Sequence, residues 1–256
     1  NDTPWTPQWG VCDGPDDCRR ATRAAIRAGA DVIKMHATGG FSDNTGLAQH
    51  MDPDEMAAVI GTAHQRGLKV ATHAYDPGAI RAALEAGVDS IEHGFLIDDE
   101  GIELMQDRGA YFVPTLSAAY PPKYIRPMIP DEDMTSLIIR DEARGFERVY
   151  AAGGRIAFGT DTGVNPHGDN WEEFPLMIKY GMSEMDALKS ATVHTAELFG
   201  IADEAGTLEA GKLADIIAID GNPLDDISAM QNVGFVMKSG AVFKHNGAIA
   251  SPYGGL

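Results

Sequence analysis

The sequence predicts an α/β fold in which parallel strands alternate with helices. Two observations support this prediction. Short apolar runs rich in β-branched residues alternate with helical patterns up to about Asp161, and glycine closes each predicted helix. Strands that alternate with helices form right-handed βαβ units, so we expect one parallel sheet covered by helices.

The predicted elements follow one another in a regular cycle. A helix over residues 16–29 precedes a strand over 31–36, and Thr38-Gly39-Gly40 then requires a sharp turn. The later units are helix 54–66 with strand 69–74, helix 77–86 with strand 89–94, helix 99–108 with strand 110–116, and helix 131–152 with strand 155–161. Five strands are therefore expected in the parallel part of the chain.

After residue 161 the pattern changes. Helices are expected near residues 171–179, 183–192 and 194–199, and strands over 215–219, 234–238 and 241–244. Ser239-Gly240 joins the last two strands as a two-residue hairpin connection. We predict a parallel domain over residues 1–205 and a small β unit over residues 206–256.

Polar residues at the strand ends favour a barrel over a doubly wound sheet. The four titratable residues concerned lie on four different strands, and they are Lys34, His73, His93 and Asp161. Barrel enzymes keep their chemistry at the carboxyl ends of the strands. A dinucleotide-binding sheet would instead carry a Gly-rich phosphate loop after its first strand, and this sequence has none there.

Each of these four residues also has a purely structural explanation. A charged lysine is costly to bury, so Lys34 must be paired, neutralised or modified, and a salt bridge would suffice. A hydrogen-bonded core position would explain His73 or His93, and turn capping would explain Asp161. Their coincidence at one mouth favours a site, because two imidazoles, a carboxylate and an anion derived from lysine suit a zinc-class ion.

The composition excludes several classes of function. The net charge of −18 repels phosphate backbones and anionic lipids, so we expect neither nucleic acid nor membrane as a partner. No run of apolar residues is long enough to span a bilayer. Cys12 and Cys18 have no histidines nearby, which excludes a zinc knuckle; free thiols are the default, with a local disulfide as the alternative.

Six short motifs occur in a characteristic order. They are ADVIK (30–34), TGG (38–40), THAY (72–75), IEHG (91–94), FGTD (158–161) and GTLEAGKLAD (206–215). Together they resemble the amidohydrolase superfamily, in particular the branch of imidazolonepropionase-like enzymes and metal-dependent Xaa-Pro dipeptidases and carboxypeptidases. The resemblance implies the C-terminal part of a metal-dependent (β/α)8 TIM barrel, strands 4 to 8, plus part of a small β-sandwich.

The resemblance also implies a metal centre. Lys34 would react with carbon dioxide to give a carbamate that bridges two metal ions, most simply Zn²⁺. His73 and His93 would hold the more exposed metal, and Asp161 would bind the other. The metals would lower the pKa of a shared water and polarise the scissile carbonyl, while Asp161 moves the proton to the leaving nitrogen.

Three further residues are candidates on the substrate side. Tyr75 lies two residues after His73 and so on the same strand face, where it would donate to the oxyanion or simply pack. His167 follows the last predicted strand and would touch substrate or be solvated. Arg126, in a proline-rich loop, would clamp a substrate carboxylate.

One departure from the family pattern concerns its first barrel strand. Members carry a His-x-His pair there, and this sequence contains none. Five strands also cannot close an eight-stranded barrel. A fragment, a processed chain with a separate N-terminal partner, and a divergent smaller fold would each explain this; we favour the first two and expect an N-terminal part of the same enzyme.

The expected function is hydrolysis of an amide bond near a free carboxylate, as in a dipeptide or an N-acyl amino acid. A cyclic amide of the imidazolonepropionase type is the enzyme alternative, and a catalytically incomplete metal-binding fragment is the non-enzyme alternative. The sequence is compatible with a homo-oligomer. The compartment is undetermined; cytoplasm is the default, and a periplasmic or secreted parent is compatible with the sequence.

Overall fold

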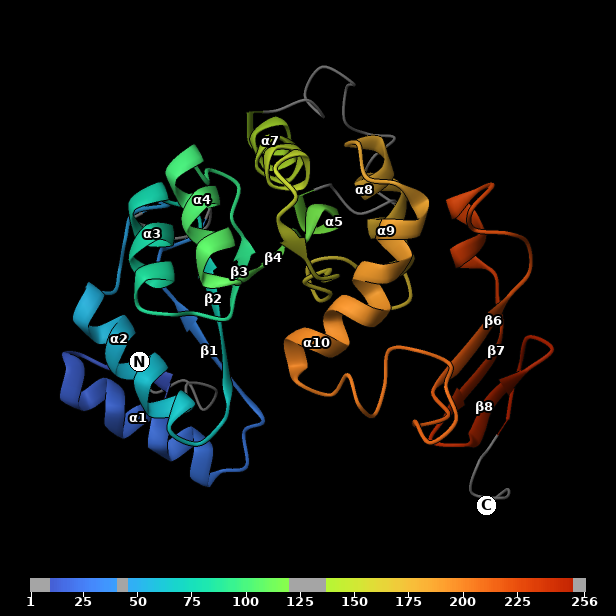
Figure 1. Ribbon diagram of the computed structural model, residues 1–256, viewed down its shortest axis with the longest axis horizontal. Helices are drawn as coiled ribbons and strands as arrows, with labels where there is room; N and C mark the ends of the chain where they lie inside the picture. Colours follow the sequence, from blue (N-terminus) through green and yellow to red (C-terminus); the bar gives the residue numbers. More distant parts are fainter. Residues whose placement is uncertain (1–9, 41–45, 120–136, 251–256) are drawn as a thin grey trace. The chain divides into compact units, whose positions relative to one another are not determined.

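The computed structural model describes residues 10–40, 46–119 and 137–250, and these belong to two compact units. The first unit comprises Asn1–Pro114 and Asp141–Arg155, and the second comprises Thr115–Arg140 and Ile156–Leu256. Figure 1 labels α1–α4 and β1–β4 in the first unit and α8–α10 and β6–β8 in the second. Within the described ranges, no helix has the length and apolar character needed to cross a bilayer.

The first unit is built on a parallel sheet whose strand order follows the chain. Its strands are β1 (Val32–His36), β2 (Lys69–Ala74), β3 (Ser90–His93) and β4 (Tyr111–Val113), and β5 (Arg155–Ile156) comes next in the order. Neighbours pair in parallel in the β1–β2, β2–β3 and β3–β4 ladders. A doubly wound sheet would reverse its order at a switch point, so the sequential order fits an arc of a barrel.

Helices connect these strands as the sequence predicts. They are α1 (Pro15–Arg27), α2 (Pro53–His64), α3 (Pro77–Glu85), α4 (Asp99–Arg108) and α7 (Leu137–Ala151). Aspartates are the N-caps of three of them, α2, α3 and α4: the carboxylate of Asp76 accepts the Ala79 N–H, and that of Asp98 accepts the Gly101 N–H. Gly109 ends α4 in the left-handed conformation that glycine tolerates. Residues 131–136 of the expected long helix lie outside the described residues.

The two faces of the sheet differ in chemistry. Alternate strand residues such as Ile33, Met35, Val70 and Ile91 are buried, and in Figure 1 helices α1–α4 line one side of β1–β4. Residues of opposite parity, which point to the other face, include the polar residues Lys34, His36, His73 and Glu92. The sheet therefore presents a polar face opposite its apolar one.

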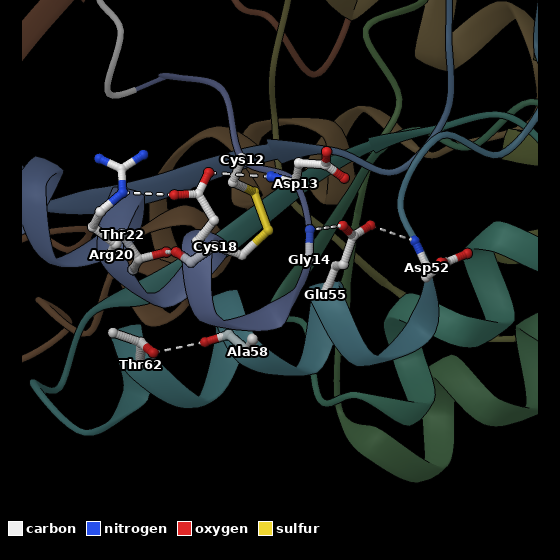
Figure 2. Close-up of a disulfide and its surroundings, with 11 residues drawn as sticks. Cys12, Asp13, Gly14, Cys18, Arg20, Thr22, Asp52, Glu55, Ala58 and Thr62 are labelled. Carbon is white, nitrogen blue, oxygen red and sulfur yellow. Dashed lines mark hydrogen bonds and ion pairs between the residues drawn. A yellow bond between two sulfur atoms is a disulfide. The ribbon is translucent and has the colours of Figure 1, made fainter.

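A disulfide between Cys12 and Cys18 fastens the chain to the first turns of α1 (Figure 2). The default expectation of free thiols is wrong, and the local disulfide is present. The two cysteines are six positions apart in the sequence, and the bend before Pro15 brings them together. Figure 2 also shows Glu55 of α2 accepting the N–H groups of Gly14 and Asp52, so that one carboxylate joins the starts of two helices.

The second unit begins with helices. They are α5 (Leu116–Ala119), the 3₁₀ turn η3 (Asn170–Glu172), α8 (Glu173–Lys179), α9 (Glu184–Lys189), the π-helical turn η4 (Ser190–His194) and α10 (Thr195–Phe199). The sequence predicts two helices after Ser183, whereas the structure has one run that passes through η4. The widened turn leaves the Ser190 carbonyl to accept from Phe158 N and from the Thr195 hydroxyl.

Two predicted strands are shorter than expected for identifiable reasons. β4 ends at Val113 because Pro114 has no N–H to donate to the ladder. β5 ends at Ile156, not at residue 161, because nearby backbone groups bond to residues of the π-helical turn η4 and not to a neighbouring strand. Phe158 N donates to the Ser190 carbonyl at 3.1 Å, and His194 Nδ1 lies 3.1 Å from the Ile156 carbonyl.

The end of the chain forms a four-stranded antiparallel sheet in the order β6-β7-β8-β9. Its elements are β6 (Ile216–Ile219), the 3₁₀ turn η5 (Ile227–Gln231), β7 (Val233–Lys238), β8 (Ala241–His245) and β9 (Ala248–Ile249). The predicted hairpin at Ser239-Gly240 is confirmed, with both residues at positive φ as a tight turn requires. β9 was not predicted, because two residues give no pattern.

Candidate metal centre

The ends of β2 and β3 bring His73, His93 and Tyr75 together within the first unit. The ring centroids of His73 and His93 lie 4.7 Å apart. Tyr75 stacks on His93 at 5.3 Å and meets His73 edge-on at 4.5 Å. The two imidazoles that the sequence proposes as ligands are therefore neighbours, with the proposed oxyanion donor beside both.

The orientation of the His73 ring is set by the glycine turn after β1. Its Nε2 lies 3.2 Å from the carbonyl oxygen of Gly39, in the TGG motif. Metal-ligating histidines commonly donate one ring N–H to a backbone carbonyl, which fixes the ring and directs the other nitrogen to the metal. His73 thus has the support expected of a ligand.

His93 is held in its neutral form. Its side chain is buried, with a relative exposure of 5%. Burial, together with the charges of His73, Lys34 and His36, lowers the pKa of His93 to about 2. A neutral imidazole keeps the lone pair that binds a cation, so His93 is ready to ligate without first losing a proton.

Lys34 departs from its predicted environment. It is the third residue of β1, not the last, and its side chain is 43% exposed. Its Nζ lies 4.0 Å from Oε2 of Glu92, whose Oε1 accepts the hydroxyl of Ser90 at 2.6 Å. The expectation that Lys34 is buried is therefore wrong. The salt bridge that the sequence analysis gave as its structural explanation is present.

Two residues of this region were missed in the sequence. His36 ends β1 and stacks on His73 with ring centroids 4.7 Å apart and an interplanar angle of 18°. The ladder places the two opposite one another, since His36 pairs with His73. Glu92 is the other. The sequence could have identified both residues. His36 lies two residues after Lys34 and so on the same strand face, and Glu92 precedes His93 on the face that carries His73.

Left-handed backbone occurs at the last residue of β3 and in the segments that follow β4 and β5. His93, Thr115 and Asp161 have φ values of 69°, 51° and 49°. Positive φ is uncommon outside glycine, and such strain gathers at functional sites. The remaining described residues of this kind are Ser239 and Asn246, which lie in the hairpin turns of the small sheet. Two of the five described non-glycine residues with positive φ, His93 and Asp161, are therefore also residues that the sequence proposes for the site.

No described contact joins the other predicted site residues to the histidine pair. Asp161 belongs to the second unit, five residues beyond β5, and is exposed, as is His167 on the loop that follows. Arg126 lies outside the described residues. Among the residues the structure describes, no group of three His, Cys, Asp or Glu side chains is arranged to hold a metal. His73 and His93 are therefore a partial donor set, which fits a metal once an anionic Lys34 or a further ligand joins it.

The model of the amidohydrolase family matches residues 2–243. The chain belongs to the amidohydrolase family. The family predicted from the six motifs is confirmed.

Two relatives and one solved structure illustrate the similarity of this amidohydrolase chain. It is 33% identical to the ochratoxinase of Aspergillus niger over 93% of the chain and 52% of that protein. It is 26% identical to an imidazolonepropionase from a Geobacillus species, over 66% of the chain and 37% of that protein. The crystal structure of a Xaa-Pro dipeptidase with methionine bound in its active site is 39% identical, with a TM-score of 0.84 over 93% of the chain and 61% of that structure.

The similarity to the Xaa-Pro dipeptidase structure confirms the predicted α/β fold of the TIM-barrel type. The parallel sheet with its helices is that of amidohydrolase structures of the TIM-barrel type. The numbering of the strands as 4 to 8, the sandwich and the domain boundary at residue 205 stay predictions. The chain spans about half the length of the ochratoxinase it matches.

Proposed function

We propose that the enzyme containing this chain is a metal-dependent hydrolase that cleaves an amide C–N bond. The observation that carries the proposal is the adjacency of His73 and His93, with one ring oriented by a carbonyl and the other neutral and buried. A histidine pair of this kind, near a lysine, is a large part of a divalent metal site. Membership of the amidohydrolase family supports the same reading.

The roles of the residues follow from their chemistry. His73, His93, Asp161 and a carboxylated Lys34 would hold divalent metal, with Zn²⁺ as the first choice. When bound, the metal supplies Lewis acidity, which lowers the pKa of a water toward neutrality and polarises the scissile carbonyl. Asp161 takes the proton from the water and gives it to the leaving nitrogen. Tyr75 donates its phenolic hydrogen to the oxygen that becomes negative.

The proposed substrate is a dipeptide or an N-acyl amino acid with a free carboxylate. The similar Xaa-Pro dipeptidase structure supports this class. His167 and Arg126 would contact the carboxylate, since a guanidinium binds it through paired hydrogen bonds. The similarity to an imidazolonepropionase supports a cyclic amide as the second candidate.

The active enzyme would need more than this chain. We propose that an N-terminal segment supplies a His-x-His pair and the remaining strands, because five strands cannot close the barrel. Assembly of the chain into a homo-oligomer is compatible with this proposal. The disulfide between Cys12 and Cys18 favours an exported parent over a cytoplasmic one, since such bonds persist in oxidising compartments.

The test is turnover by the enzyme that contains this chain and an N-terminal His-x-His segment. A panel of Xaa-Pro dipeptides, N-acyl amino acids and cyclic amides should show hydrolysis of the carboxylate-bearing linear amides above the others. Asp161→Asn should lower kcat by about 100-fold or more, the contribution typical of a general acid-base group. Activity confined to cyclic amides would replace the leading substrate by the second candidate.

The matched control is Asp203→Asn, which removes an exposed carboxylate from a turn elsewhere in the second unit. It should keep wild-type turnover. Unchanged turnover in Asp161→Asn would contradict the proposed role of that residue. Absence of activity on every amide, with or without the N-terminal segment, would favour a non-catalytic metal-binding protein.

A further inference from the structure

Asp161 lies in a tight loop whose backbone is held by hydrogen bonds. Its φ of 49° is left-handed, a conformation that aspartate tolerates better than most residues but does not prefer. Its carbonyl accepts the Val164 N–H at 3.2 Å, and the Gly163 N–H donates to the Asn165 carbonyl at 3.0 Å. Such a backbone persists where the surrounding contacts impose it.

Asn170 supplies contacts on both sides of Asp161. Its Nδ2 donates to the hydroxyl oxygens of Thr160 at 3.1 Å and of Thr162 at 2.6 Å, and these two oxygens lie 2.7 Å apart. Its Oδ1 accepts the Gly168 N–H at 3.2 Å. One side chain therefore ties the two neighbours of Asp161 to the first residue of η3.

The same loop has a buried anchor at its other side. Ser117 Oγ donates to the Thr160 carbonyl at 3.3 Å, and the side-chain amide of Asn165 donates to the Ser117 carbonyl. The fully buried carboxyl group of Glu173 accepts the Ser117 N–H at 2.7 Å. The Asp161 loop is thus attached to α5 and α8 inside the unit, and Asn170 closes it at the solvent side.

We propose that Asn170 is a positioning residue for Asp161: by holding Thr160 and Thr162 together, it keeps the carboxylate aimed at the reacting water. The inference rests on the proposed function, in which Asp161 moves protons. Asn170 acts through its neighbours and not on the substrate. Its hydrogen bonds are exposed, so their removal should loosen the loop without unfolding the unit.

The experiment compares Asn170→Ala with wild type in the complete, metal-loaded enzyme. Amide hydrogen exchange of residues 160–165 should speed up in the variant, because a loosened loop opens the hydrogen bonds of the Gly163 and Val164 N–H groups more often. In the same preparation kcat should fall by about 10-fold to 100-fold, the effect of a small misplacement of a catalytic group. KM should change by less than about twofold, because substrate binding is untouched.

Asn222→Ala is the matched control. Asn222 is an exposed asparagine of the same unit whose side chain donates to Asp225 and accepts the Leu224 N–H. It should leave kcat and the exchange of residues 160–165 unchanged. A variant Asn170→Ala with wild-type exchange, or with wild-type kcat, would overturn the inference.

The two proposals fail in different ways. If wild type hydrolyses no amide, the proposed function fails and the inference falls with it. If wild type is active and Asn170→Ala equals it, the inference alone is overturned. A fall in kcat with a rise in KM and a large loss of thermal stability would assign Asn170 a merely structural role, and would also overturn the inference.

Discussion

Replacing Asp89 by asparagine should destabilise the first unit in a way that depends on pH. The Asp89 carboxylate lies before β3 and accepts three hydrogen bonds of 2.8 Å. They come from Lys69 Nζ, His64 Nε2 and the N–H of Val70. These partners lie at the start of β2 and the end of α2, so one side chain joins two strands and a helix at the end of the sheet opposite the histidine pair.

The expected loss follows from the exposure of the partners. A buried hydrogen bond to a charged group contributes about 1.5–3 kcal/mol, whereas exposed pairs contribute about 0.2–1 kcal/mol. Asp89 is 13% exposed, but Lys69 and His64 are 44% and 40% exposed, so their contributions lie between these limits. The Asn side chain keeps an acceptor for Val70 N. We therefore expect Asp89→Asn to lower the free energy of unfolding by about 2 kcal/mol at pH 7.

The sign of the pH dependence is set by the pKa of Asp89. Burial raises this pKa, but hydrogen bonds from Lys69, His64 and Val70 outweigh it, so the pKa in the folded protein lies below its ordinary value. The stabilisation is present above the unfolded pKa of about 3.9 and is lost as pH falls through the folded pKa. The difference between wild type and Asp89→Asn should thus be full at pH 7 and shrink below about pH 4.

Urea unfolding followed by circular dichroism at pH 7 and at pH 3 measures both quantities. Asp107→Asn is the control, because Asp107 is an exposed carboxylate of α4 in the same unit. It should stay within about 0.5 kcal/mol of wild type at both pH values. An Asp89→Asn difference that is absent at pH 7, or equally large at pH 3, would refute the reasoning.

Three further changes test the packing of the first unit. Replacing Cys12 and Cys18 together by serine should cost about 2 kcal/mol, the value for a short closed loop, and reducing agent should then lower the melting temperature of wild type but not of this variant. Glu55→Gln should lower the free energy of unfolding in urea by about 1–2 kcal/mol, since the amide keeps only one acceptor oxygen for the N–H groups of Gly14 and Asp52. Gly94→Ala should lower the melting temperature by several degrees, because a Cβ there would collide with the Phe112 ring and the backbone φ is +63°. For each of the three changes, wild-type stability in the stated measurement would contradict the corresponding contact.

The strands and helices of the first unit were predictable because local signals and tertiary contacts agree there. The run at 69–74 is β2 itself, and the pattern at 99–108 is α4 with Gly109 as its left-handed end. The end of β5 was not predictable, because it depends on a carbonyl freed by the π-helical turn η4, far along the chain. Tertiary competition for backbone groups leaves no trace in a local pattern.

The candidate site was predictable in part. The motifs identified His73 and His93, which lie on the paired strands β2 and β3, one residue apart in register, with ring centroids 4.7 Å apart. His36 was missed because Lys34 was considered alone, without its same-face neighbour. The Glu173 network could not be foreseen either. Glutamate in a helix normally faces solvent, and its burial is visible only once α8 meets α5.

The central claim is that His73 and His93 form part of a divalent metal site. The most direct measurement is the metal content, by mass spectrometry, of the complete enzyme in wild type, His93→Ala and His245→Ala. His245 is an exposed histidine of the small sheet and serves as the control. We predict bound zinc-class metal in wild type and His245→Ala, and loss of metal from His93→Ala. Equal metal content in wild type and His93→Ala, or no metal in any of the three, would contradict the account.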